Sequence, residues 1–149
     1  MKTIFDKTTR DELIYRIDSL NENNTAQWGK MNISQMLKHC TLYEEWIQGK
    51  YHHRYKQSVI GRLFGKMALK DLLKDENPMR RNMPTIPALK VREAGNVPLE
   101  KKKWITLIED YAHYSNPGFI HSFFGKMTID EIGFLDYKHS DHHLRQFNG

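Results

Sequence analysis

Apolar side chains recur at steps of three and four residues in four stretches of the chain, which is the period of an amphipathic α-helix. These stretches cover residues 8–20, 32–48, 98–115 and 128–147. Amphipathic helices of this length must bury their apolar stripes against one another. The pattern therefore predicts an all-α four-helix bundle, which we expect to form a single domain over residues 1–149.

The segment between the second and third of these helices has a less regular pattern. Residues 58–74 predict an extra helix, with a rough apolar face made of Ile60, Leu63, Phe64, Met67 and Leu72. The opposite face is basic, as in helices that bind membrane surfaces. Asp71 and Asp75 dilute that charge, however, and a small bundle needs the apolar face for its own core, so membrane binding is not expected. Residues 77–98 contain four prolines and predict a long ordered loop across the bundle. That loop is either a lid over a substrate site or a passive crossover.

Two of the predicted helices begin with the same signature. An aromatic residue followed by Gly-Lys-Met precedes both Asn32 and Thr128. Gln35 stands three residues after Asn32, and Glu131 stands three residues after Thr128, which is the spacing of a capping box. The sequence therefore predicts helix starts at these two positions and suggests that the two helices occupy related places in the bundle.

Two histidines lie on the apolar stripe of the last predicted helix, which continues to Gln146. His139 and His143 are four residues apart, which places their Cβ atoms about 6 Å apart on one face. His39 lies at the edge of the apolar face of the 32–48 helix. If these two helices pack side by side, the three imidazoles meet inside the bundle, where such folds build metal sites. The alternative is that the histidines are polar residues on a partly exposed helix end.

A set of three neutral histidines indicates a divalent metal. It leaves one or more coordination positions for water or substrate, which is the arrangement of a catalytic zinc site. The same donors also suit nickel, iron, cobalt or manganese, so the pattern does not select the metal.

Four further side chains are candidates for the wall or outer shell of this site. Tyr43 and Trp46 share the helical stripe of His39 and are expected to wall the site. Asp136 lies one turn before His139 and either orients that imidazole or is simply solvated; the pattern favours the solvated carboxylate. His121 either hydrogen-bonds the loop backbone or reaches the site.

The remaining histidines and the single cysteine show no ligand pattern. His142 points about 100° away from His143 on the helical wheel, so it is interpreted as flanking the site. The same divergence separates Cys40 from His39, and Cys40 is interpreted as a small buried hydrophobic residue. The surface or core edge is the expected place of His52, His53 and His113.

The motifs around these residues resemble a known family. W-G-K-M-x-x-x-Q-M-L-x-H at residues 28–39, and H-x-F-F-G-K-M-T with Y-K-H-x-D-H-H-L-R-Q-F at residues 121–147, are similar to the DinB-like superfamily of small four-helix bundles, in one of its uncharacterised bacterial branches. The resemblance implies a divalent metal, with zinc or nickel favoured, held by His39, His139 and His143. It also implies a transferase that uses a low-molecular-weight thiol on a small electrophile, with a thiol or water activated by the metal.

Two alternatives to that enzyme stay open. One is a non-catalytic, stress-associated bundle protein that binds a metal or a small molecule. The other is a plain homodimeric bundle whose histidines bind nothing.

Composition narrows the class of protein and its partners. A hydrophobic content of 39% with 28% charged residues is typical of a globular protein, and no apolar run approaches the roughly 18 residues of a membrane span. The first residues contain no apolar signal region, and one cysteine suits a reducing compartment, so a cytoplasmic protein is expected. The net charge of +5 is spread among acidic residues without a recognition motif, so we expect a small-molecule substrate and neither nucleic acid nor membrane as partner. Two short basic clusters, Arg80-Arg81 and residues 101–103, are solvated faces or attract an anionic substrate.

Overall fold

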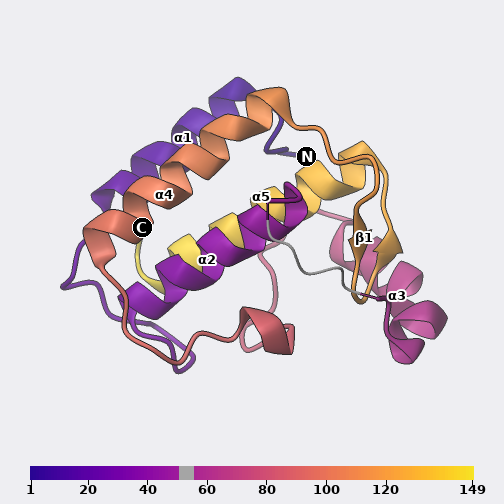
Figure 1. Cartoon of the computed structure of the whole chain (residues 1–149), viewed down its shortest axis with the longest axis horizontal. Helices are drawn as coiled ribbons and strands as arrows, with labels where there is room; N and C mark the ends of the chain where they lie inside the picture. The colour runs from indigo at the N-terminus through magenta and orange to yellow at the C-terminus, as the bar shows by residue number, and fades with distance from the viewer. Residues whose placement is uncertain (51–55) are drawn as a thin grey trace.

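The computed structural model describes residues 1–50 and 56–149 (Figure 1). Its α-helices are α1 Lys7–Ser19, α2 Ile33–Ile47, α3 Val59–Leu72, α4 Val97–Glu109 and α5 Ile129–Gln146. Two 3-10 turns, η1 Pro87–Leu89 and η2 Asp110–His113, and an antiparallel hairpin of β1 Ile120–His121 with β2 Gly125–Lys126 complete the described elements. The prediction of an all-α bundle with an extra helix and a long proline-containing loop is confirmed.

Four of the helices close a ring around the core. α4 packs against both α1 and α2, and α5 packs against both α1 and α2. Figure 1 shows α1 beside α4 and α2 beside α5, with α3 and the hairpin to one side of these four helices. Trp104 of α4 is fully buried inside the ring, with Leu13 and Ile17 of α1 and Met36 and Leu37 of α2 among the buried residues of the same core.

The two predicted capping boxes are both present. The Asn32 side chain accepts from the Gln35 backbone N–H, and the Gln35 side chain accepts from the Asn32 backbone N–H. Thr128 and Glu131 exchange the same two bonds at the start of α5. These bonds satisfy backbone donors that a helix start leaves free, and they fix where the two histidine-bearing helices begin.

The starts of α1 and α4 differ from the prediction. α1 begins at Lys7 after Asp6, whose side chain makes no capping hydrogen bond, and Thr9 is buried within the first turn. α4 begins one residue before Pro98, and its cap is Asn96, whose side chain accepts from the Leu99 backbone N–H. A proline in the first turn of a helix loses no intrahelical hydrogen bond, so this start is favourable.

The predicted apolar face of α3 is wrong. Ile60, Leu63, Phe64 and Met67 are exposed, and Leu72 is half-buried. The side of the helix that faces the protein carries Gly61, Gly65 and Leu69 instead.

Glycine explains this choice of face. A Cβ atom added to Gly61 or Gly65 would lie 2.4 or 2.2 Å from the Phe123 carbonyl oxygen, which is closer than real Cβ atoms approach other atoms. The backbone of α3 therefore packs directly on the hairpin, which larger side chains would prevent. Close backbone contact, and not burial of the larger side chains, orients this helix.

The hairpin closes one end of the bundle. Phe119 and Phe124 are buried there, in agreement with the apolar character of the loop, although the two short strands carry no sequence signal that predicts them. Gly125 has a φ of +76°, a conformation that favours glycine at this turn.

The long loop after α3 is tied to the bundle at several points. The buried Lys138 of α5 donates to the carbonyls of Leu72 and Asp75, at 2.7 and 2.8 Å. Further on, Gln35 of α2 donates to the Arg92 carbonyl. The loop thus crosses both helices that carry the candidate histidines. Among the described residues, no helix is both long and apolar enough to cross a membrane.

Candidate metal centre

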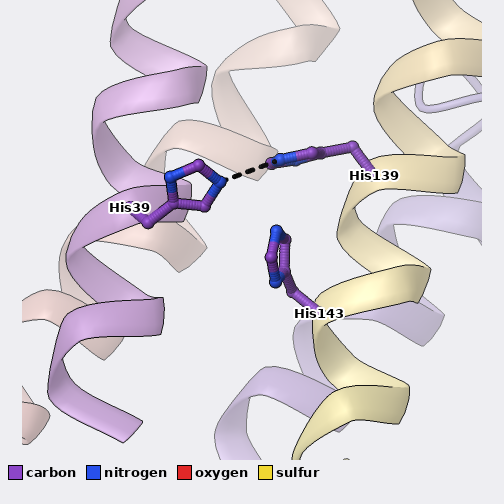
Figure 2. Close-up of side chains that lie close together, drawn as sticks. All are labelled: His39, His139 and His143. Atoms are coloured by element: carbon purple, nitrogen blue, oxygen red, sulfur yellow. Dashed lines mark hydrogen bonds between the residues drawn. The ribbon is translucent and has the colours of Figure 1, made fainter. Parts of the chain in front are cut away.

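The structure brings His39 of α2 together with His139 and His143 of α5. One nitrogen from each ring lies within 4.8 Å of the other two, and the three side chains face one another across the gap between the helices (Figure 2). The side chains are 3%, 9% and 7% exposed, respectively. Residues separated by a hundred positions in the sequence therefore form one buried cluster, the histidine triad.

The tautomer of His39 follows from its contact with the loop. Its Nδ1 lies 2.8 Å from the carbonyl oxygen of Leu89, which can only accept a hydrogen bond. Nδ1 therefore carries the proton, and in the neutral ring Nε2 has a free lone pair. That lone pair points into the triad.

A two-step relay fixes His143 in the same way. The Gln146 side chain donates through Nε2 to the carbonyl of Trp28 at 2.7 Å, which determines the orientation of its amide. Its Oε1 then lies 2.9 Å from Nδ1 of His143 and accepts a proton from it. The neutral ring of His143 therefore also has its lone pair on Nε2. Such partners orient the imidazole ligands of metal sites.

His139 completes the set of donors. Its ring stacks on Tyr43 with 3.7 Å between the ring centroids, and its Nδ1 is buried without a hydrogen-bond partner. Its Nε2 lies 3.3 Å from Nε2 of His39, within hydrogen-bond distance, and because His39 Nε2 carries no proton, the Nε2–H of His139 is the donor. Two ligand nitrogens bound to one tetrahedral zinc ion, at about 2.0–2.1 Å each, stand about 3.3–3.4 Å apart. The spacing of this pair fits a shared divalent ion.

Burial keeps the triad in its ligand form. Desolvation lowers the pKa of His39, and it lowers the pKa values of His139 and His143 well below the ordinary value of histidine. The neighbouring imidazoles lower the pKa values of His139 and His143 further, because two positive rings would repel at this distance. The rings are therefore neutral at neutral pH, which is the state that binds metals.

Residues 3–149 match the family described as "Protein of unknown function (DUF1569)". The chain belongs to this family. The matched region contains both capped helices and all three histidines of the triad. Neither the curated proteins nor the solved structures contained a match.

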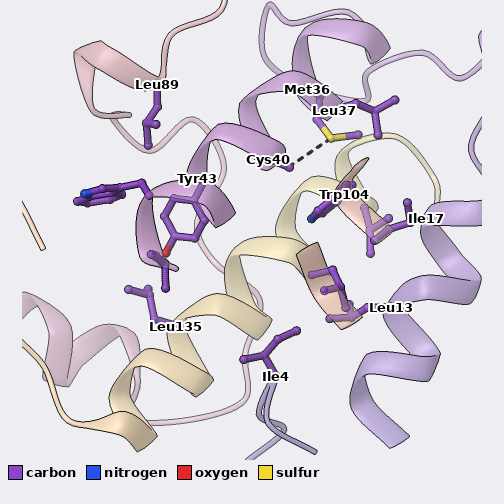
Figure 3. Close-up of a cluster of buried hydrophobic side chains, with 14 of the residues drawn as sticks. Ile4, Leu13, Ile17, Met36, Leu37, Cys40, Tyr43, Leu89, Trp104 and Leu135 are labelled. Carbon is purple, nitrogen blue, oxygen red and sulfur yellow. Dashed lines mark hydrogen bonds between the residues drawn. The ribbon is translucent and has the colours of Figure 1, made fainter. Parts of the chain in front are cut away.

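Aromatic side chains line one side of the triad. Tyr43 stacks on His139, Trp46 lies beside Tyr43, and His121 lies 5.0 Å from Trp46 between ring centroids. Figure 3 shows Tyr43 on the same side of α2 as Leu89, whereas Cys40 lies on the other side, toward Trp104. Tyr43 is thus in direct contact with the triad, and Trp46 is one ring further away.

His121 is occupied by the loop backbone. Its Nδ1 accepts from the backbone N–H groups of both Phe123 and Phe124, each at 3.1 Å. Burial lowers the pKa of His121 to about 3, which keeps Nδ1 free to accept both bonds. These contacts hold the turn of the hairpin.

Asp136 differs from both of its predicted roles. It is fully buried, so the solvated interpretation is wrong, and its hydrogen bond comes from the Tyr111 hydroxyl and not from His139. The same hydroxyl lies 2.7 Å from Glu44 of α2. Asp136, Glu44 and Tyr111 form a second buried group, the carboxyl cluster. Burial and the charge of Glu44 raise the pKa of Asp136 well above its ordinary value.

The other candidates lie around the site or away from it. His142 packs against the rings of Trp28 and His143, and the Arg81 guanidinium lies 4.4 Å above the Trp28 ring. Burial raises the pKa of Cys40 well above its ordinary value, so this thiol is not a nucleophile. His113 is exposed, and His52 and His53 lie outside the described residues.

Three contributions were missed by sequence reasoning. Gln146 lies on the predicted stripe three residues after His143, so its position was visible, but its relay to Trp28 was not. Glu44 lies on an apolar stripe of α2, and a carboxylate at such a position is a signal for a buried polar cluster. The Leu89 carbonyl carries no sequence signal, because any residue supplies a carbonyl.

Proposed function

We propose that the histidine triad holds a divalent metal ion, zinc or nickel, in a protein of the DinB-like kind. The observation that carries the proposal is the hydrogen bonding of two Nδ1–H groups, that of His39 to Leu89 and that of His143 to Gln146. Because these protons are on Nδ1, the Nε2 atoms of both rings keep their lone pairs and face His139. A divalent ion that displaces the proton shared by His39 and His139 would take the lone pairs of both rings, together with that of His143. The motif resemblance and the all-α bundle support the same assignment.

The activity that fits such a site best is the transfer of a low-molecular-weight thiol to a small electrophile. When bound, a divalent metal lowers the pKa of a thiol or water molecule and so supplies a nucleophile near neutral pH. The surrounding groups fix the imidazoles in place: the Tyr43 ring covers one face of His139, and the backbone carbonyl of Leu89 orients His39. Arg81, near Trp28 and His142, is a cation that would attract an anionic thiol.

A second candidate function is supported by the burial of the triad. All three histidines are at most 9% exposed, and Tyr43 and Leu89 cover them from two sides. A catalytic site must admit a substrate, so this closure also fits a non-catalytic protein that binds a metal or a small molecule. The two functions share the metal and differ in turnover.

Elemental analysis of the protein, purified without chelator or histidine tag, tests the shared part. We expect close to one metal ion per chain, and loss of that ion in each of His39→Ala, His139→Ala and His143→Ala. His113→Ala is the matched control, because His113 is exposed and has no place in the triad. Unchanged metal content in the three variants would show that the ligand assignment is wrong.

A thiol assay separates the two functions. Metal-loaded protein is incubated with a panel of low-molecular-weight thiols and a chlorinated aromatic electrophile, and chloride release is followed. Transferase activity predicts release that depends on the thiol and is absent in His143→Ala. A metal-loaded protein that never exceeds the uncatalysed rate supports the binding protein instead.

A further inference from the structure

The outward side of α3 is an apolar surface that no described residue covers. Val59, Ile60, Leu63, Phe64 and Met67 are between 51% and 72% exposed. Their spacing puts them on one side of the helix, opposite the buried Gly61, Gly65 and Leu69. We call these five side chains the outer face of α3. Large apolar side chains that are exposed together mark an interaction site.

The packing of α3 explains why this face is exposed to solvent. The helix lies outside the four-helix ring, next to the hairpin (Figure 1). Its two glycines press its backbone against the Phe123 carbonyl, so the helix cannot rotate its apolar side chains inward without losing that contact. The expectation that the bundle core needs this face, which argued against a membrane-surface helix, therefore no longer holds.

Positive charge is concentrated around the same helix. Residues 56–75 contain five basic side chains and two acidic side chains, Asp71 and Asp75, and the whole chain has a net charge of +5. Lys66 is near Glu131, and Lys74 pairs with Asp71. Arg62 and Lys70 are exposed and have no acidic partner among the described residues. The basic excess of the chain thus borders the outer face of α3.

We propose that the outer face of α3 docks on an anionic bilayer surface. The helix would lie in the plane of the interface, with its five apolar side chains among the lipid chains and its basic side chains at the phosphates. A second copy of this chain is a weaker fit. A two-fold pairing of the same face would bring two basic borders together without acidic partners. Charge complementarity therefore favours the anionic surface.

Co-sedimentation with lipid vesicles tests the proposal on the full chain. We expect binding to vesicles of phosphatidylcholine with phosphatidylglycerol, weaker binding at high salt, and little binding to phosphatidylcholine alone. Leu63→Glu and Phe64→Glu should each reduce partitioning at least about tenfold, because each places a charge in the inserted face. Leu99→Glu, at an exposed leucine of α4, is the matched control and should bind as the unchanged chain does.

Both test residues are exposed, so circular dichroism should show an unchanged fold in all three variants. Absence of binding to the anionic vesicles would overturn the proposal, as would equal binding by Leu63→Glu. The proposal would also be overturned if the chain does not bind the vesicles but forms a dimer in analytical ultracentrifugation that Leu63→Glu dissociates. That result would assign the outer face of α3 to a second copy.

Discussion

The histidine triad and the carboxyl cluster both join buried polar side chains of α2 and α5, the second with Tyr111 of η2, but their hydrogen bonding differs. In the carboxyl cluster, the Tyr111 hydroxyl bonds to both acids, donating its one proton to one carboxyl and accepting from the other, in keeping with the raised pKa of Asp136. Trp104 and Ser140 contribute longer contacts to Glu44. In the triad, the Nε2 atoms of His39 and His143 are acceptors because their protons are held elsewhere. The carboxyl cluster bonds to a hydroxyl, an indole N–H and a serine and so ties elements of the fold together, although Asp136 Oδ1 has no partner among the described residues. The triad turns ring nitrogens toward one another from two helices, which suits a shared cation.

The largest effect that separates the two clusters is expected for Glu44→Ala. The substitution leaves the Trp104 N–H without its buried acceptor and opens a cavity beside Tyr111, so we expect a loss of about 2–4 kcal/mol in the free energy of unfolding. Urea denaturation measures this loss. The folded fraction should still bind metal, because no triad residue bonds to Glu44.

Glu44→Gln is the matched control for that variant. The amide retains the shape and one acceptor oxygen, so stability should change by about 1 kcal/mol or less. Loss of metal binding in folded Glu44→Ala would contradict the separation of the two clusters.

His121 is a buried histidine outside the triad whose Nδ1 accepts two backbone hydrogen bonds. Its titration shows how a buried histidine with a structural role affects stability. Its pKa is about 3 in the folded chain and about 6.5 when unfolded. Below about pH 6.5 the unfolded chain binds the extra proton, so this residue lowers stability by about 1.4 kcal/mol for each pH unit down to about pH 3.

His121→Asn should remove this contribution, because an amide oxygen can accept the same backbone bonds without titrating. The measurement is the difference in unfolding free energy between the two proteins from pH 7 to pH 4. A difference that stays constant across this range would mean that His121 does not titrate in this way.

Gln146→Ala tests whether the relay to Trp28 prepares His143 as a ligand. Removing a hydrogen-bond partner of a metal-bound histidine weakens metal affinity about 10–100-fold. Competition with a chromogenic chelator measures the change. Gln146→Glu is the matched control: its carboxylate can still accept from His143, so it should keep more affinity than the alanine variant. Equal metal affinity in all three proteins would mean that Gln146 does not contribute to the metal site.

The smallest effect is expected for Asp136→Asn. Because the pKa of Asp136 is raised, its contribution to stability is fully present below about pH 4 and is lost as the pH rises through the raised pKa. The amide keeps an acceptor for Tyr111 and cannot ionise, so stability near pH 8 should rise by about 1 kcal/mol or less. A thermal unfolding series from pH 4 to pH 8 should show a flatter profile for the variant.

Local signals in the sequence predicted the elements that hold the triad. The capping boxes at Asn32 and Thr128 are set by residues three positions apart, and the spacing of His139 and His143 follows from helix geometry. Their meeting with His39 depends on how α2 and α5 pack. The capped starts and apolar stripes made that packing a reasonable expectation.

What the sequence did not predict depends on contacts between distant segments. The outward orientation of α3 follows from the fit of Gly61 and Gly65 to the Phe123 carbonyl, and an apolar stripe alone does not reveal this contact. The Leu89 carbonyl reaches His39 across fifty residues. The sequence favours a solvated Asp136 because the partners that bury it, Glu44 and Tyr111, lie on other elements.

The most direct test of the triad is a calorimetric titration of zinc into chelator-stripped protein. We expect saturation at one ion per chain for the unchanged sequence, and no saturable binding when His39, His139 and His143 are all replaced by alanine. Equal binding by the triple variant, or no binding of zinc, nickel or cobalt by the unchanged chain, would contradict the metal site.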